Sequence, residues 1–153
     1  MPHTEDHREL PYTAQQMFDL VADIESYPKF LPWNSAARIR SRSERPDGAT
    51  VIKADLVISF KVFRERFGSN VILWPRDEQG RLRIDIDYLD GPFKYLRSAW
   101  VFTDRPEGSC RVDFTVDFEF KNMILQRLIG VVFGEAMSRI VRAFEARAKT
   151  LYG

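Results

Sequence analysis

The sequence predicts an α+β fold in which a curved antiparallel sheet of about six to seven strands wraps around a long C-terminal helix, with two short helices after the first strand. Three observations support this prediction. Apolar and polar residues alternate in segments between residues 37 and 120, as in half-buried strands. Short turn sequences separate these segments, and strands joined by short turns pair antiparallel. Beyond Asn122 the apolar spacing changes to that of an α-helix.

The N-terminal part is expected to form one strand and then the two short helices. A short polar strand runs from about residue 3 to residue 10. Thr13 followed three residues later by Gln16 is a capping-box pattern, and apolar residues at helical spacing come after it. The helix should end by Tyr27, because a residue that precedes a proline disfavours the helical conformation.

Six further segments have the pattern of strands. The last is the clearest, because apolar residues alternate with polar ones from Val112 to Phe120. Turn sequences such as Asp90-Gly91-Pro92 separate the segments. The expected strands are residues 37–42, 51–62, 67–74, 82–88, 96–102 and 112–120.

The C-terminal helix should extend from Asn122, which can cap it, to about Tyr152. Its apolar residues span an arc of about 200°, whereas a surface helix needs a stripe of about 100°. A sheet of six to seven strands spaced about 4.8 Å apart is roughly 30 Å wide, so one helix about 10–12 Å wide cannot cover it. We therefore expect a space between sheet and helix, which either is filled by aromatic side chains or remains as an apolar pocket.

The composition excludes several classes of protein. All 153 residues are expected to form a single domain, which at this size can bury its own core. The 44% of hydrophobic residues excludes disorder as the main state. A net charge of +1 argues against binding to a polyanion through overall charge, and the one cysteine excludes a disulfide framework. The 12 Phe, 5 Tyr and 3 Trp residues fill either a large core or a lined cavity.

The location of the protein is expected to be cytoplasmic. No segment approaches the ~18 apolar residues of a membrane span, and the first residues lack the features of a secretory signal.

Four short sequence segments occur in a characteristic order: YPKFLPW at 27–33, GPFKYL at 91–96 with WVF at 100–102, VDFEFKN at 116–122 and FGEA at 133–136. In this order they resemble the coenzyme-Q-binding members of the START-like (helix-grip) superfamily and their relatives, the bacterial ribosome-association toxins. The resemblance spans about residues 3–148. Many relatives have a cysteine after the Pro-Trp pair, where this chain has Asn34, so no role of that thiol is carried over.

The resemblance implies a binding protein with a deep apolar tunnel for ubiquinone or a similar polyprenyl lipid. Such a protein acts as a carrier that supports respiration or quinone synthesis. We expect a monomer with no cofactor besides bound ubiquinone, in transient contact with the inner face of the membrane. Tyr27, Trp33 or Tyr95 can donate a hydrogen bond to the quinone head, and residues 27–33 form either a lid or a plug in the core. The expected ligand contacts are Tyr27, Phe30, Leu31, Pro32, Trp33, Phe93, Tyr95, Trp100, Phe114, Val116, Phe118, Phe133, Met137, Ile140 and Phe144.

The alternative function implied by the resemblance is binding to the large ribosomal subunit, which blocks subunit joining. Residues 121–153 carry six basic and two acidic residues, and a second arginine cluster lies at 38–45, its first three arginines on one strand face. Each of these two basic clusters either contacts phosphate groups or is the solvated face of an amphipathic element. The candidate nucleic-acid contacts are Arg38, Arg40, Arg42, Arg139 and Arg142.

The sequence contains no catalytic constellation that we can identify. His3 and His7 are the two histidines; they share a strand face, and without a third ligand a solvated strand explains them better than a metal site. Polyketide cyclases share the superfamily, but an enzyme needs polar groups that converge in the pocket. The inward positions of the last strands supply almost none, so we expect a non-enzymatic, metal-free carrier.

Overall fold

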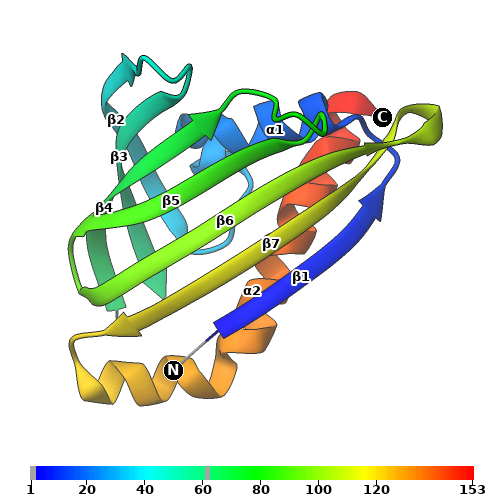
Figure 1. The fold of residues 1–153 in the computed structure, drawn as a ribbon. Helices are drawn as coiled ribbons and strands as arrows, with labels where there is room; N and C mark the ends of the chain where they lie inside the picture. The colour runs from blue at the N-terminus through cyan, green and yellow to red at the C-terminus, as the bar shows by residue number, and fades with distance from the viewer. Residues whose placement is uncertain (1–2, 61–62) are drawn as a thin grey trace.

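Seven antiparallel strands form one curved sheet in the order β1-β7-β6-β5-β4-β3-β2, as Figure 1 shows. The computed structural model describes residues 3–60 and 63–153, apart from the side chains of residues 60, 63, 129, 132 and 133. The predicted fold class is confirmed. The elements are β1 (His3–Leu10), α1 (Ala14–Ala22), η1 (Ile24–Lys29), β2 (Asn34–Glu44), β3 (Thr50–Phe60), β4 (Phe63–Trp74), β5 (Leu82–Asp90), β6 (Phe93–Arg105), η2 (Pro106–Gly108), β7 (Ser109–Phe120) and α2 (Met123–Tyr152).

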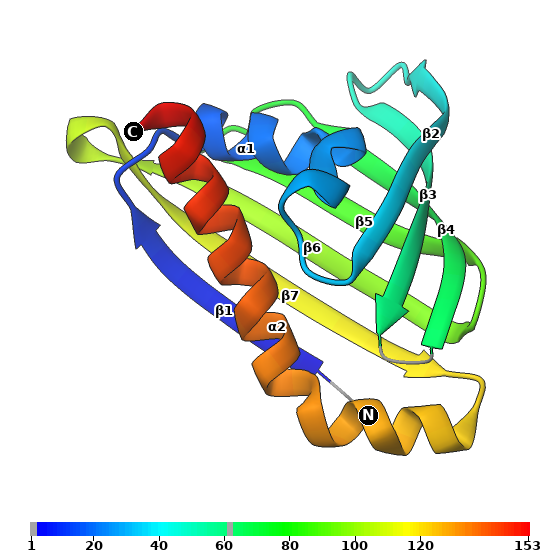
Figure 2. The ribbon, with the colours of Figure 1, turned by 180° about the vertical axis from the view of Figure 1, so that it is seen from behind.

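The helices lie on one face of the sheet, as seen from behind in Figure 2. α2 packs on β1, β7 and α1, whereas η1 packs on β2 at the other edge of the sheet. None of the helices in the described residues has the length and apolarity needed to cross a membrane. α1 packs on the middle strands β5 and β6 and on β7, so the three helices together cover parts of both edges and of the middle of this face.

The capping box at the start of α1 is present: Gln16 N donates to Thr13 Oγ1 at 3.1 Å, and Thr13 N donates to Gln16 Oε1 at 2.9 Å. α1 ends at Ala22, earlier than expected, and the chain continues as the 3-10 helix η1 with Pro28 inside it. The tighter turn of η1 is stabilised because the Tyr27 hydroxyl donates to the carbonyl oxygen of Val21. The two predicted short helices are thus confirmed, with the break at Asp23.

β7 shows the predicted alternation along its whole length, with every second residue from Cys110 to Phe120 buried. The thiol of Cys110 is fully buried, and this burial raises its pKa to about 11. An uncharged thiol without access to solvent is unreactive, in agreement with a structural role.

α2 uses its two halves differently. In the C-terminal half Val141, Phe144 and Ala148 are buried against the core. In the N-terminal half the apolar side chains of Met123, Ile124, Leu128 and Val131 are exposed, by 57, 72, 63 and 86%. The first turns of α2 extend beyond the end of β7, and the helix then bends toward the sheet edge (Figure 2). The wide apolar arc of the helix is thus covered by the sheet in one half and left at the surface in the other.

Candidate ligand-binding site

An interior cavity of about 120 Å³ lies between η1 and the middle strands of the sheet. It is bounded by η1 on one side and by β3 to β6 on the other, in the region that α2 leaves uncovered. Its lining is mostly apolar. The lining residues are Ile24, Tyr27, Ala54, Leu56, Phe67, Ser69, Val71, Ile86, Leu96 and Ser98.

The cavity exists because small side chains occupy inward positions on adjacent strands. Ala54 of β3 lies opposite Ser69 of β4, and Ser98 of β6 lies opposite Ile86 of β5. Alanine and serine fill less volume than the Phe and Trp residues farther along the same sheet. Small inward residues are the signal that sequence reasoning missed, since it followed the aromatic residues.

The volume of the cavity matches one ring and not a long lipid. An apolar protein cavity of about 150 Å³ holds one benzene molecule. The 120 Å³ of this cavity therefore accommodates about one ring, whereas a polyprenyl chain has to lie outside it. The deep tunnel that the family resemblance implied is not present as closed space in the described part of the chain.

Aromatic side chains fill the interior beside β1 and α2. The ring of Trp100 lies 4.3 Å from that of Phe114 and 5.1 Å from that of Phe144, measured between centroids. The space left among these rings is about 10 Å³. These three predicted ligand contacts are therefore core residues in this structure. The aromatic residues therefore mainly fill the core, and among the described residues only Tyr27 and Phe67 of the cavity's lining are aromatic.

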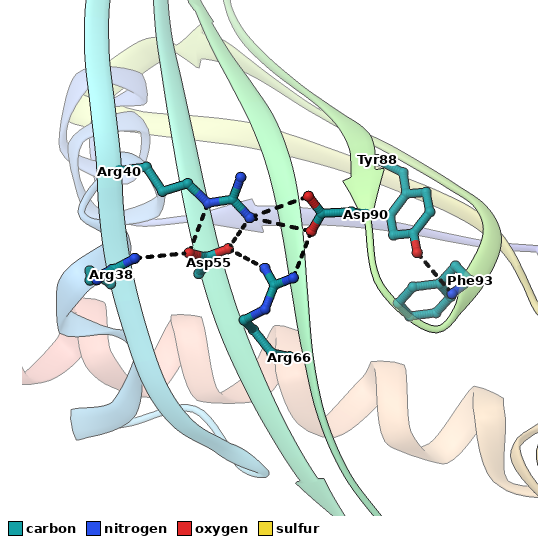
Figure 3. A network of polar contacts seen from close by, with 7 residues as sticks. All are labelled: Arg38, Arg40, Asp55, Arg66, Tyr88, Asp90 and Phe93. Carbon is teal, nitrogen blue, oxygen red and sulfur yellow. Dashed lines mark hydrogen bonds and ion pairs between the residues drawn. The ribbon is translucent and has the colours of Figure 1, made fainter.

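A second aromatic cluster, at the other end of β6 and β7, connects the cavity with the start of α2. Phe93 packs edge-on against Phe67, which also lines the cavity, and stacks on Phe120 at 4.6 Å. Its backbone N–H donates to the Tyr88 hydroxyl at 3.1 Å (Figure 3). Phe120 N in turn donates to Gln126 of α2 at 2.8 Å. A continuous set of packed aromatic rings therefore lies between the cavity and the start of α2.

The segment 27–33 closes one side of the interior. Tyr27 is buried and lines the cavity, and desolvation raises the pKa of its hydroxyl. Because this hydroxyl donates to Val21, its hydrogen is not available to a ligand, contrary to our expectation. The rings of Tyr27 and Phe30 pack against Phe144 at 5.5 and 5.4 Å. In this structure the segment acts as a plug that completes the core.

The remaining predicted contacts lie in several places. Leu31, Pro32 and Trp33 are half-buried, and Trp33 has a left-handed backbone with φ of 61°. The side chain of Phe133 lies outside the described residues. Four further predicted ligand contacts are packed in or against the core: Val116, Phe118, Met137 and Ile140.

Tyr95 lies on the outer face of the sheet, so it cannot donate to a ligand in the interior cavity. It lines a groove of about 560 Å³ between β5 and β6. The groove forms because the pairing of β5 with β6 ends at Asp87 and Arg97, whereas β5 stays paired with β4 as far as Asp90. Leu96 borders both this groove and the cavity, and therefore separates the two spaces.

The predicted nucleic-acid contacts on β2 belong partly to an ion-pair network, shown in Figure 3. Arg40 Nε donates to Asp55 at 2.8 Å, and Arg66 Nη1 donates to it at 2.6 Å. The hydrogen bond from Arg40 lowers the pKa of Asp55 to about 2. Arg40 is therefore occupied within the fold, whereas Arg38 is 75% exposed and approaches Asp55 only to 3.6 Å.

The other arginine candidates lie elsewhere. A register shift after Ile39 places Arg42 opposite Ile52, so Arg42 lies on the other strand face from Arg38, and the expectation of one shared face is wrong. Arg139 pairs with Glu135 at 3.1 Å on α2. Since α2 packs near β1 and β2 is the opposite edge, the helix and strand arginines do not form one surface.

The two histidines stabilise an edge of the sheet. His3 is bound to Asp117, and His7 Nδ1 lies 2.6 Å from Asp113. These hydrogen bonds raise the pKa of both imidazoles. No group of three metal-ligating side chains is found among the residues that the structure describes.

Residues 10–145 match the family model described as "Polyketide cyclase / dehydrase and lipid transport". The chain belongs to this family. It is 41% identical, over 92% of this chain and 91% of the relative, to "Ribosome association toxin RatA" of Rickettsia prowazekii. It is also 31% identical to "Coenzyme Q-binding protein COQ10 homolog B, mitochondrial" of Xenopus laevis. That alignment covers 94% of this chain and 57% of the relative.

A solved START superfamily protein from Mycobacterium smegmatis has the same fold, with a TM-score of 0.78 at 18% identity over 97% of this chain and 98% of that one. The resemblance to the START-like family is therefore confirmed. The polyketide cyclase and lipid transport family combines catalysts with lipid carriers, so the chemistry of the cavity has to distinguish these classes in this chain.

Proposed function

We propose that this protein binds a polyprenyl quinone such as ubiquinone and carries it for respiration or quinone synthesis, without catalysing a reaction. The observation that supports this proposal most is the ring-sized apolar cavity, together with the packed rings of Phe67 and Phe93 beside it and the exposed apolar half of α2. Each Å² of apolar ligand surface removed from water contributes about 25 cal/mol. The cavity takes the ring, and the tail follows the aromatic cluster to α2. The named relative that binds coenzyme Q supports the same assignment.

The cavity lining favours binding over catalysis. Apart from the buried Tyr27, the lining among the described residues contains no side chain that ionises. A pocket without a general acid or base can hold a ligand but cannot exchange protons with it at neutral pH. The exposed apolar residues of α2 provide the contact with the inner face of the membrane during exchange of the ligand.

Organic extraction of the purified protein, followed by mass spectrometry, should recover a polyprenyl quinone. Leu128→Glu should lower transfer of ubiquinone between vesicles about tenfold, because the charge opposes burial of the exposed apolar surface of α2. Leu151→Glu is the matched control, since Leu151 is 49% exposed at the far end of the same helix. Recovery of no lipid, together with no transfer by the unaltered protein, contradicts the proposal.

The similarity to RatA favours a second candidate function, binding to the large ribosomal subunit so that the subunits do not join. Arg38 is the strand arginine best placed to contact phosphate, because it is exposed and only loosely paired. Arg38→Glu should weaken binding to ribosomal subunits at least tenfold, and binding should fall steeply with salt. Arg97→Glu, at a residue 81% exposed on β6, is the control. Sucrose-gradient profiles that the protein leaves unchanged exclude this candidate.

A further inference from the structure

Two serine residues with little exposed surface line the interior cavity. Ser69 of β4 is 2% exposed and Ser98 of β6 is 8% exposed. Within the described part of the chain, neither hydroxyl takes part in a hydrogen bond. The buried side-chain atoms without a partner in the described residues are Asn34 Oδ1 and Asn70 Oδ1, so the two serine oxygens keep some accessible surface where they line the cavity. Both hydroxyls are therefore available to a molecule that enters it.

The two serines lie on the same face of the sheet, on strands that flank β5. Ser98 is opposite Ile86 of β5, and Ile86 is opposite Val71 of β4; Ser69 lies two residues before Val71 on the same face. One strand therefore separates the two serines. A ring that rested on Ile86 would therefore lie between the strands that carry the two serines.

We infer that Ser69 and Ser98 are the polar recognition pair of this cavity and that they select an uncharged six-membered ring bearing oxygen atoms on two sides, as in a 1,4-benzoquinone or its quinol. This inference rests on the proposed function and names the chemistry of the head group. A serine hydroxyl both donates and accepts a hydrogen bond, so it serves a carbonyl oxygen and a phenolic hydroxyl equally. The cavity therefore binds the oxidised and the reduced ring with similar affinity.

The same lining discriminates against charged rings. No charged side chain borders the cavity among the described residues. A ring that carries a carboxylate loses its hydration on entry and finds no counter-charge, which is unfavourable. The site should thus reject 4-hydroxybenzoate while it accepts a neutral quinone of similar size.

The test is calorimetric titration with a ubiquinone analogue that carries one isoprene unit. Ser69→Ala and Ser98→Ala should each weaken binding about two- to tenfold, the effect of one hydrogen bond. Their melting temperatures should stay nearly unchanged, because each variant removes a hydroxyl that forms no hydrogen bond within the described part of the chain. Ser43→Ala, at an exposed position of β2, should change neither quantity. The quinol should bind within about threefold of the quinone, and 4-hydroxybenzoate should not bind.

The outcomes separate this inference from the proposed function. Binding to the unaltered protein that both alanine variants retain in full overturns the serine assignment alone. A fall in melting temperature in the variants shows that the hydroxyls serve the fold, and also overturns it. No binding of the quinone to the unaltered protein overturns the proposed function and the assignment together.

Discussion

Replacement of Phe144 by alanine is expected to lower the free energy of unfolding by about 3–5 kcal/mol. Phe144 is 4% exposed, and its ring contacts those of Tyr27, Phe30 and Trp100. It thereby joins η1, the sheet and the C-terminal half of α2. Removal of the ring leaves a cavity, because η1, the sheet and α2 cannot all shift far enough to fill the space. Urea denaturation followed by circular dichroism measures the effect.

The control for this variant is Leu128→Ala on the same helix. Leu128 is 63% exposed, so its truncation should change the free energy of unfolding by less than about 0.5 kcal/mol. If Phe144 were a ligand contact and not a core residue, Phe144→Ala would weaken quinone binding and leave the stability nearly unchanged. That result would contradict our assignment of the Trp100–Phe144 rings to the core.

Asp55→Asn is expected to lower the free energy of unfolding by about 1–3 kcal/mol at pH 7. The side chain of Asp55 is nearly buried and accepts hydrogen bonds from Arg40 and Arg66. Loss of its charge leaves these two guanidinium groups without their central partner. The lower part of the range applies if solvent screens the arginines, which are 31 and 49% exposed.

The pH dependence has a definite sign. The folded pKa of Asp55 is about 2, below the ordinary value of 3.8, so its stabilisation is fully present above about pH 4. The stabilisation is lost as the pH falls from 4 through 2, because the unfolded chain binds the proton first. The difference between the native protein and Asp55→Asn should therefore shrink between pH 5 and pH 2.

Asp87→Asn provides the control for the ion-pair network. Asp87 is 51% exposed and lies 4.0 Å from Arg97, so the variant should cost less than about 0.5 kcal/mol. A separate variant, Gly68→Ala, should mimic Asp55→Asn in part, because its Cβ would lie 2.5 Å from Nη2 of Arg40. Equal stability of Asp55→Asn and the native protein from pH 7 to pH 3 would contradict a stabilising network.

The elements and several of their boundaries were predictable because they depend on local pattern. The alternation of residues 112–120, the capping box at Thr13 and the cap at Asn122 all appear as expected. Strands were longer than predicted at ends where polar residues interrupt the apolar alternation, as in β6, which extends from Phe93 to Arg105. Backbone pairing with a neighbouring strand continues there although the side-chain pattern does not.

The face on which a side chain lies was less predictable wherever a strand contains a register shift. A shift after Phe93 directs Phe93 inward and Tyr95 outward, and a shift after Ile39 moves Arg42 away from Arg38. One extra residue reverses the face of every residue that follows it. Such shifts depend on the partner strand, which a local pattern does not reveal.

The sequence by itself determined the order of elements, the antiparallel sheet, the family and the presence of more apolar surface than one helix can cover. Only the tertiary structure decided where that surface goes: aromatic rings fill the interior beside α2, small residues leave a cavity beside η1, and the first half of α2 remains exposed. The physical reason is that alternation assigns a residue to a face, whereas a cavity depends on the combined volume of side chains from four strands and a helix. Ser69 and Ser98 are inconspicuous in the sequence and become neighbours of one space only when the sheet is assembled.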